Sequence, residues 1–447
     1  MDSPKTLSFS YDIIQIKSEG LIMLKSVILA AGKGTRMKSE TPKVLHTIFD
    51  KTLVGYVIDA VNGTGLADEN FVIVGHQAER VEEYINENYK NAKTVLQSPQ
   101  LGTGHAVSMV LPYLNDFDGE VVILCGDTPL ITSETLKEFV EYHKTNKSDL
   151  TVMSAIFDNP TNYGRIIRGS NGHVEGIVEE KDATLEQKEI KEINAGIYCL
   201  DWQKIKPAFS ELKTNNAQGE YYLTDIIKWG NEQGFEVNAY TLKNNEEIYG
   251  INSKANLAEA AKFLNQRVIK KHFTNGVTII DPSTTWISPE TEIEPDTVIY
   301  PSTYIEGKNT IGKNCKIGPF AHLRGGVTLE DNVKIGNFVE VKKAHIKSHT
   351  NACHLTYIGD AEIGSNVNVG AGTITANYNP LTKVKSKTII EDNVKIGSNS
   401  VLVAPVKIEE GANVGALSVI TKDLPAWALA ITRAPLRIIE GWVNKNK

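Results

Sequence analysis

The fold of the C-terminal half is decided by residues 287–341, which read ISPETEIEPDTVIYPSTYIEGKNTIGKNCKIGPFAHLRGGVTLEDNVKIGNFVEV. From Ile287 to Val341 an aliphatic residue recurs at every sixth position, ten times in succession. Gly, Glu, Asn or Asp often follows it, and Gly and Asn tolerate the positive φ that a tight corner needs. This period is the signature of a parallel β-helix of hexapeptide repeats, in which one aliphatic side chain per repeat points inward.

The six-residue period is interrupted twice and then resumes. Its later aliphatic positions are Ile363, Val369, Ile390, Ile396, Leu402, Ile408, Val414 and Ile420. The period breaks within residues 340–360 and again at the insertion 376–387, which we expect to project from a coil. A β-helix is often purely structural, so the repeats alone predict a fold and no reaction.

The N-terminal half has another pattern, in which short apolar runs alternate with helix-like stretches. The runs are residues 26–31, 71–74, 121–124 and 151–156. They predict an α/β domain with an open, mostly parallel, Rossmann-like sheet, whose ligands bind beyond the carboxyl ends of the strands. Residues 256–272 carry apolar residues at helical spacing, which predicts a linker helix that acts as a rigid arm.

Composition restricts the class of protein. The 447 residues include 47 basic and 54 acidic ones, a net charge of −7, with no block of like charge. We therefore expect no nucleic-acid and no membrane partner. No apolar run approaches the ~20 residues of a membrane helix, and charged residues within 1–22 argue against a secretory signal. The four cysteines form no Cys-x-x-Cys pair, which fits a cytoplasmic protein.

A glycine-containing loop, Gly32-Lys33-Gly34-Thr35-Arg36, directly follows the first apolar run. Its glycines let the backbone bend sharply, and its N–H groups can form a nest for a phosphate. The Walker A spacing is absent, so the loop does not indicate a P-loop ATPase. The basic residues Arg36 and Lys43 favour phosphate binding over a plain strand–helix connection.

With Gly32–Met37 and Pro42-Lys43, the chain resembles the sugar-nucleotide pyrophosphorylases. Further motifs are similar to the branch that uridylylates N-acetylglucosamine 1-phosphate, and they lie at 97–106, 163–165, 178–182, 192–196 and 218–222. Residues 340–345, 354–360 and the insertion resemble the glucosamine-1-phosphate acetyltransferase half of the same bifunctional family. The resemblance covers nearly all of residues 23–447.

The resemblance implies an architecture and two reactions. The expected parts are an extension (1–22) ahead of a natural start near Met23, a uridylyltransferase domain (23–254), a linker helix (255–275) and an N-acetyltransferase domain (276–447) with left-handed coils. Acetyl-CoA would acetylate glucosamine 1-phosphate, and UTP would then convert N-acetylglucosamine 1-phosphate into UDP-N-acetylglucosamine for bacterial cell-wall synthesis (peptidoglycan and lipopolysaccharide). The family forms homotrimers.

For the first site the resemblance implies two sets of contacts and a metal. The uridine and its phosphates would be held by Leu29, Ala30, Ala31, Gly32, Gln97, Gly102 and Thr103, and the sugar by Gly164, Glu179 and Asn194. Asp127 and Asn252 would ligate Mg²⁺, a hard cation that suits their oxygens. Arg36 and Lys43 would neutralise charge during attack on the α-phosphorus of UTP. Lys43 and Asn252 would also contact the substrate.

For the second site the resemblance implies His354 as the general base that takes a proton from the attacking amine. Arg324 and Lys342 would bind the sugar phosphate, and Tyr357, Asn368 and Asn377 would place the sugar. The acetyl-CoA groove would be lined by Ala371, Tyr378, Ser398, Ala416 and Arg433.

Plainer interpretations stay open at this point. An isolated aspartate such as Asp127 often caps a helix, and an isolated histidine is more often a satisfied surface or core residue. The repeats would then serve only to oligomerise a nucleotidyltransferase, or the chain would be a scaffold like the exchange-factor subunits of translation initiation. Two departures from the family are Cys125, where an aromatic residue is frequent, and the interval from Asn252 to Arg324, which is shorter by about two coils of about 18 residues.

Overall fold

A computed structural model describes residues 23–442. The expected extension at 1–22 lies outside the described residues. The chain forms two compact units, with the boundary between Ser253 and Lys254. The short stretch Thr47–Lys51 belongs to the second unit although it comes early in the sequence. Within residues 23–442, none of the helices combines the length and the apolar character needed to cross a membrane.

The first unit is built on a twisted sheet with strand order β11-β7-β10-β6-β1-β4-β5. These strands are β1 (Leu24–Leu29), β4 (Ala67–Val74), β5 (Ala92–Leu96), β6 (Glu120–Cys125), β7 (Leu150–Ile156), β10 (Glu192–Asp201) and β11 (Val237–Thr241). Strand β1 pairs in parallel with β4 and β6, as the apolar runs predict, but β10 enters antiparallel between β6 and β7. The antiparallel pair β8 (Arg165–Arg168) and β9 (Val174–Val178) adjoins β10.

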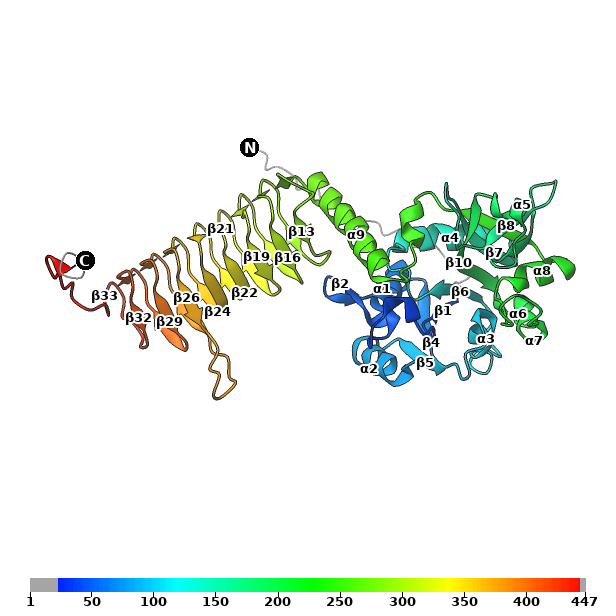
Figure 1. The fold of residues 1–447 in the computed structure, drawn as a ribbon, viewed down its shortest axis with the longest axis horizontal. Coiled ribbons are helices and arrows are strands. Elements are labelled where there is room, and N and C mark those ends of the chain that lie inside the picture. The colour runs from blue at the N-terminus through cyan, green and yellow to red at the C-terminus, as the bar shows by residue number, and fades with distance from the viewer. Residues whose placement is uncertain (1–22, 443–447) are drawn as a thin grey trace, which may run out of the picture. The chain divides into compact units, whose positions relative to one another are not determined.

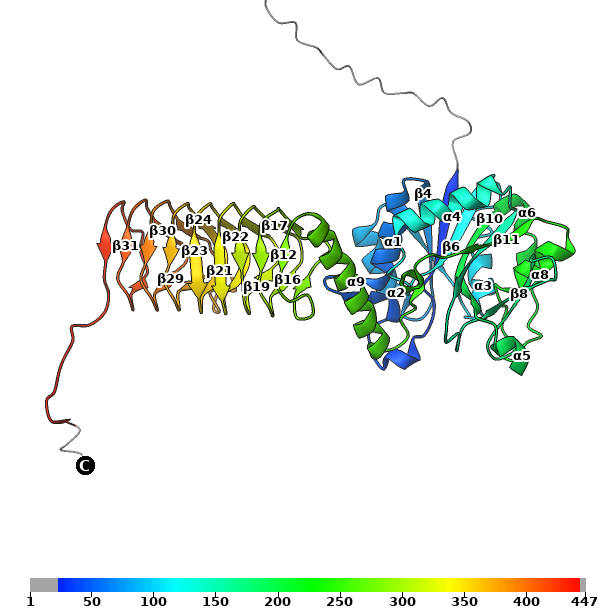
Figure 2. The ribbon, with the colours of Figure 1, turned by 90° about the horizontal axis from the view of Figure 1, so that it is seen from above.

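Helices cover both faces of this sheet, because successive residues of its buried strands face opposite sides. On one face lie α1 (Leu53–Thr64), α2 (Ala78–Asn88) and α4 (Ser133–Thr145). On the other lie α3 (Thr103–Ser108), α6 (Trp202–Ile205), α7 (Ala208–Glu211) and α8 (Asp225–Glu232), and Figure 2 shows α1 and α3 on opposite sides of the sheet. The mostly parallel α/β fold expected for this half is confirmed.

The second unit is a parallel β-helix with three faces. One face carries β12 (Thr278–Ile279), β15 (Val298–Ile299), β18 (Lys316–Ile317), β21 (Lys334–Asn337), β23 (Asn351–His354), β25 (Asn368–Val369), β28 (Lys395–Ile396), β31 (Asn413–Val414) and β33 (Leu429–Ala430). The next carries β13 (Trp286–Ile287), β16 (Tyr304–Glu306), β19 (His322–Arg324), β22 (Glu340–Ile346), β24 (Tyr357–Ile363), β26 (Ile374–Ala376), β29 (Val401–Val403) and β32 (Val419–Ile420). The third carries β14 (Glu292–Ile293), β17 (Asn309–Ile311), β20 (Val327–Leu329), the far ends of β22 and β24, β27 (Thr388–Ile390) and β30 (Val406–Ile408).

The aliphatic residues of the six-residue period fill the interior of this β-helix, as predicted. Each is at most 6% exposed, and all belong to one continuous core. Ile287 pairs with Ile305, and Ile305 with Leu323, so each coil stacks on the coil 18 residues ahead. The insertion does project, because residues after Ala376 leave the coil as a loop that Figure 1 shows extending from between β26 and β29.

The linker helix α9 (Lys254–Thr274) also covers one end of this core. Val268 and Ile269 belong to the β-helix core. The buried amide of Asn265 donates to the carbonyl of Thr285 at 2.8 Å and accepts from the N–H of Ile287 at 3.0 Å. The helix therefore satisfies backbone groups of the first coil that have no preceding coil to bond.

The stretch Thr47–Lys51 packs on the first coils of the second unit. It includes β2 (Thr47–Ile48) and the start of β3 (Lys51–Thr52). The ring of Phe49 lies 6.2 Å from that of Trp286 and 6.5 Å from that of Tyr304, and Lys51 pairs with Glu290 at 3.2 Å.

Replacing one inward leucine should test the assignment of the core. Leu329 is 1% exposed, so Leu329→Ala should lower the free energy of unfolding of the β-helix by about 2–5 kcal/mol, through lost burial and a residual cavity. Leu381 is 92% exposed at the tip of the insertion, and the same substitution there should change stability by less than about 0.5 kcal/mol. Chemical denaturation followed by circular dichroism measures both. Equal losses would contradict the assignment.

Candidate active sites

A pocket of about 470 Å³ opens in the first unit beyond the carboxyl ends of β1 and β6. Its lining contains most of the residues expected to hold the nucleotide, which are Leu29, Ala30, Ala31, Gly32, Lys43, Gln97, Gly102, Thr103 and Asp127. It also contains residues to which the sequence assigned no contact, which are Lys33, Val44, Gln100, Ala106, Cys125 and Glu220. Gln100 and Glu220 lie inside family motifs, and that position was the available signal.

Two glycines permit the close approaches that shape this pocket. Gly34 has φ 58°, and a Cβ there would lie 2.7 Å from Cβ of Lys43. Gly102 has φ 112°, and a Cβ there would lie 2.6 Å from the carbonyl oxygen of Tyr221. A side chain at either position would be strained and would collide with its neighbour. The buried amide of Gln97 donates to the carbonyl of Gly102 at 2.9 Å, which fixes the far wall.

The side chains of Lys43, Asp127 and Asn252 converge at the mouth of β6. The ammonium of Lys43 donates to Oδ2 of Asp127 at 2.5 Å and to Oδ1 of Asn252 at 3.3 Å. The N–H of Ile251 donates to the carbonyl of Asp127 at 3.0 Å, which holds the Asn252 loop beside the strand. Two oxygens directed at one cation, one from a carboxylate and one from an amide, are a donor set that fits Mg²⁺.

The residues expected to hold the sugar form a second group in the same unit. The N–H of Asn194 donates to the carbonyl of Gly164 at 2.9 Å, and a Cβ on Gly164 would lie 3.5 Å from Oε2 of Glu179. Burial raises the pKa of Glu179, although a hydrogen bond from Thr224 opposes the shift. None of Gly164, Asn194 and Glu179 is among the residues that line the 470 Å³ pocket.

Cys125 connects the sugar group to the nucleotide pocket. Its side chain lines the pocket, and burial and then the charge of Asp127 raise the pKa of its thiol to about 12, with a further contribution from Glu179. Arg36 lies elsewhere. It is exposed in the short 3-10 helix η1 (Thr35–Met37), outside the pocket lining, so this structure does not bring it together with Lys43.

In the second unit, the parallel register places Arg324 and Lys342 on adjacent coils, directly after the paired residues Leu323 and Val341. The guanidinium of Arg324 donates to Glu340 at 2.8 Å and lies 3.4 Å from Glu306. Two stacked cations suit a phosphate group, which would take the place of the carboxylate partners.

Tyr357 and Asn377 meet one coil further along. Nδ2 of Asn377 donates to the Tyr357 hydroxyl at 3.5 Å and to the carboxylate of Asp360. Gly359 makes this possible, since a Cβ there would lie 2.3 Å from the hydroxyl of Tyr357 and 2.8 Å from Nδ2 of Asn377. Gly359 and Asp360 both lie in the 354–360 motif, but the sequence assigned a role to neither.

A row of predicted residues follows one corner of the β-helix. Ala352 pairs with Val369, Val369 with Ile396, and Ile396 with Val414. Two residues after each of these come His354, Ala371, Ser398 and Ala416, which therefore occupy equivalent positions on four successive coils. At the end of the row Arg433 donates to the carbonyl of Ala416 at 2.8 Å. The row forms a track of small residues that ends at an exposed imidazole.

The remaining predicted residues flank this row. Asn368 lies in β25, where it pairs with Asn351. Tyr378 is 51% exposed at the base of the insertion and forms a bridge with Lys385. His354 and Tyr357 lie on either side of the corner that contains Leu355 and Thr356. The hydroxyl of Thr356 donates to the carbonyl of His354 at 2.7 Å, which fixes this corner.

Comparisons with known proteins match both units. The nucleotidyl transferase family model matches residues 25–260, and the bacterial transferase hexapeptide model matches residues 310–343 and 387–422. The bifunctional protein GlmU of Caldanaerobacter subterraneus subsp. tengcongensis is 48% identical over 456 positions, which cover 95% of this chain and 98% of that protein. Those of Acetivibrio thermocellus and Clostridioides difficile are each 45% identical, with 95% and 94% of this chain and 98% of each relative covered.

The buried carboxylate of Glu179 should make stability depend on pH. Because its folded-state pKa is raised, the folded protein loses stability as the pH rises from the ordinary carboxyl pKa through that raised value. Glu179→Gln should therefore match the wild type near pH 4 and exceed its free energy of unfolding near neutral pH. Urea denaturation at the two pH values measures this difference.

The exposed residue Glu87 supplies the control, because Glu87→Gln removes one carboxylate from the surface of α2. It should show no comparable gain at neutral pH. A Glu179→Gln variant that is less stable than the wild type at both pH values would show that the carboxylate is better stabilised than its burial indicates.

Proposed function

The chain belongs to the family of the bifunctional GlmU proteins, and from this premise we propose how its two units divide two reactions on one sugar phosphate. It is a bifunctional transferase, with an acetyltransferase activity and a uridylyltransferase activity. The second unit acetylates glucosamine 1-phosphate, and the first joins the product to UMP. The observation that carries the assignment is that a separate set of convergent polar groups lies in each unit.

In the first step the amine of glucosamine 1-phosphate attacks the thioester carbonyl of acetyl-CoA. The C–N bond forms, the C–S bond breaks and coenzyme A leaves as the thiol. His354 accepts the proton that the amine must lose, since only the free amine is nucleophilic. The stacked cations of Arg324 and Lys342 hold the phosphate, and the Tyr357–Asn377 pair holds the sugar. The row Ala371, Ser398 and Ala416, whose side chains are small, admits acetyl-CoA beside His354.

In the second step a phosphate oxygen of N-acetylglucosamine 1-phosphate attacks the α-phosphorus of UTP, and pyrophosphate leaves. The loop Leu29–Gly32, with Gln97, Gly102 and Thr103, holds the nucleotide in the pocket. Asp127 and Asn252 hold Mg²⁺, which when bound offsets negative charge on the phosphates. Lys43 and Arg36 contribute positive charge to the reacting phosphates, and Gly164, Glu179 and Asn194 position the sugar. The product, UDP-N-acetylglucosamine, supplies cell-wall synthesis.

A homotrimer is supported by an exposed apolar ladder at the corner beside His354. Phe320, Phe338 and Leu355 occupy successive coils, each has a positive φ, and they are 51%, 57% and 62% exposed. The rings of Phe320 and Phe338 stack at 5.1 Å. Bulky residues are unfavourable at positive φ, and a contiguous apolar patch beside a site is typical of an interface. Neighbouring copies would cover the ladder and complete the groove. The free cysteines support a cytoplasmic location.

The two reactions should respond separately to substitutions in the two units. Asp127→Asn should slow uridylylation on the order of 10³-fold and leave acetylation unchanged, because only the first site uses the metal. His354→Ala should slow acetylation by about 10² to 10⁴-fold and leave uridylylation of ready-made N-acetylglucosamine 1-phosphate unchanged. Mass spectrometry of the products from purified protein measures both rates.

Asp118→Asn and His349→Ala are matched controls, because both residues are exposed and neither belongs to a proposed site. Both variants should retain both activities. If folded His354→Ala acetylates at the wild-type rate, the competing interpretation holds, in which the β-helix of a nucleotidyltransferase only oligomerises the chain.

The assembly is tested by charging the apolar ladder. Phe338→Asp should convert a trimer into monomers in light scattering, and it should abolish acetylation while uridylylation continues, since only the second site needs its neighbour. Phe273→Asp is the control, because Phe273 is also exposed (46%) but lies on α9, away from the ladder. A wild-type monomer with full acetyltransferase activity would refute the trimer.

A further inference from the structure

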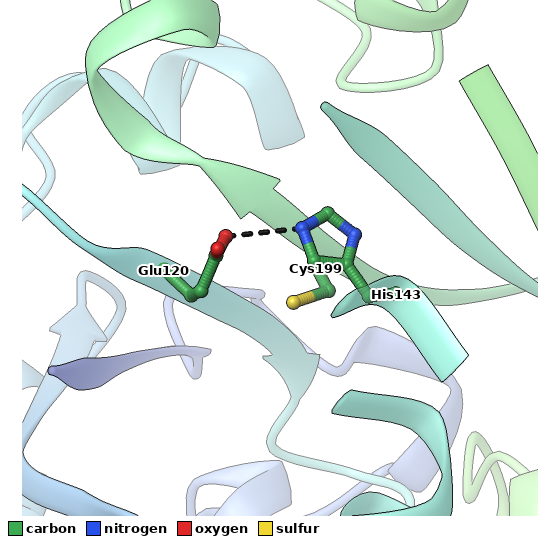
Figure 3. A group of neighbouring side chains, drawn as sticks. All are labelled: Glu120, His143 and Cys199. Carbon is green, nitrogen blue, oxygen red and sulfur yellow. Dashed lines mark hydrogen bonds and ion pairs between the residues drawn. The ribbon is translucent and has the colours of Figure 1, made fainter. Parts of the chain in front are cut away.

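A second polar cluster lies in the first unit at the opposite end of β6 from the nucleotide pocket. Strand β6 runs from Glu120 to Cys125, and its carboxyl end leads to Asp127. Its amino end brings Glu120 beside His143 and Cys199, whose potential ligand atoms all lie within 4.8 Å of one another. Figure 3 shows the three side chains converging from β6, α4 and β10. Neither proposed reaction uses them.

The sheet register explains why these groups meet. Cys199 of β10 pairs with Val122 on one side and with Thr151 of β7 on the other. Glu120 lies two residues before Val122 and so faces the same side of the sheet. That side is covered by α4, whose last turn carries His143. Thr151 and Cys199 are fully buried and His143 is 1% exposed, so these polar groups lie inside an otherwise apolar layer.

The imidazole of His143 is oriented by hydrogen bonds at both nitrogens. Nδ1 lies 2.7 Å from the hydroxyl of Thr151, and Nε2 lies 3.0 Å from Oε2 of Glu120. A histidine that binds a metal commonly donates its other N–H to an oxygen, which fixes the tautomer and the ring plane. Thr151 is placed to accept such a bond from Nδ1–H, and Nε2 then directs its lone pair toward Glu120 and Cys199.

We propose that Glu120, His143 and Cys199 form a binding site for a divalent cation of the Zn²⁺ class, separate from the Mg²⁺ site. One carboxylate, one imidazole and one thiolate are a donor set that zinc accepts in tetrahedral geometry, and hard cations such as Mg²⁺ disfavour the nitrogen and sulfur. Two ligands of a tetrahedral zinc lie roughly 3.3–3.6 Å apart. The Glu120–His143 pair is at 3.0 Å, and small side-chain rotations bring the sulfur from within 4.8 Å to that spacing.

Binding exchanges a proton for the metal. The thiol of Cys199 loses its proton to solvent as the metal–sulfur bond forms, while the imidazole stays neutral and the carboxylate charged. The side chain of Glu120 is 21% exposed, which gives the ion a route from solvent and leaves room for a water as the fourth ligand. A bound ion would join β6, β10 and the end of α4, and so would stabilise this end of the sheet.

Cobalt absorption tests the site in the full-length chain. Protein stripped with a chelator is titrated with Co²⁺, which gives a near-ultraviolet charge-transfer band only when a thiolate binds it. The expected result is a band that saturates at one equivalent per chain, disappears on addition of Zn²⁺ and is absent in Cys199→Ser. The thermal midpoint of the metal-free wild type should rise with Zn²⁺, while that of Cys199→Ser should stay unchanged.

Further variants separate this site from the nucleotide pocket and keep the test valid if Cys199→Ser does not fold. Glu120 is partly exposed, so Glu120→Gln should fold and bind Co²⁺ at least 10-fold more weakly. Thr151→Val should weaken binding by about 10- to 100-fold, through loss of the bond to His143. Cys125→Ser, which removes the thiol of the nucleotide pocket, should keep the band. No band in the wild type, a band retained by Cys199→Ser or unchanged affinity in Glu120→Gln would overturn the proposal.

Discussion

The residue-by-residue pairing of each coil with the next is the constraint on which the second unit depends. If a coil gained or lost a residue without compensation, inward aliphatic side chains would turn outward, because side-chain direction alternates along a strand. The chain departs from the 18-residue step at two places. Val341 pairs with Ile358 after 17 residues, and Ile363 pairs with Ile390 after 27. At both places the aliphatic residues return to the interior, so the extra or missing residues are confined to corners and to the projecting loop.

These irregular coils are also the coils that carry the proposed acetyltransferase residues. The short step separates the Lys342 coil from that of Tyr357, and the insertion begins at Asn377. A regular hexapeptide coil offers outward side chains on flat faces, which provide little depth for a substrate. A shortened corner and a projecting loop supply relief on that surface. Regular pairing elsewhere keeps His354 in line with Ala371, Ser398 and Ala416. The same register therefore serves both packing and the alignment of the site.

Patterns local in sequence predicted much of this molecule. The six-residue period identified the core of the β-helix, and the strand ends identified the loop at Gly32 and the carboxylate of Asp127. What the sequence could not supply depends on contacts between distant segments. The bond from Lys43 to Asn252 spans 209 positions, and the antiparallel entry of β10 depends on its partners β6 and β7. His143 reads as an ordinary polar residue at a helix end, and only the fold places it beside Cys199. The alignment with the Caldanaerobacter protein runs over 456 positions, more than the 447 residues here, so this chain lacks residues that its relative has. That difference agrees with the shortened interval expected before Arg324.

The second unit is assembled from two separate stretches of sequence, since Phe49 packs on Trp286 and Tyr304. The gene therefore cannot be divided into two independent cassettes at the codon for Ser253. Recombination between relatives at that point would join the β-helix of one parent to the Thr47–Lys51 stretch of the other, and the three aromatic rings would come from different lineages. Selection on Phe49 should follow the history of residues more than 200 positions away, and the histories of its immediate neighbours in the first unit should differ from it. In this protein, the unit of inheritance for the C-terminal fold begins well inside the N-terminal half.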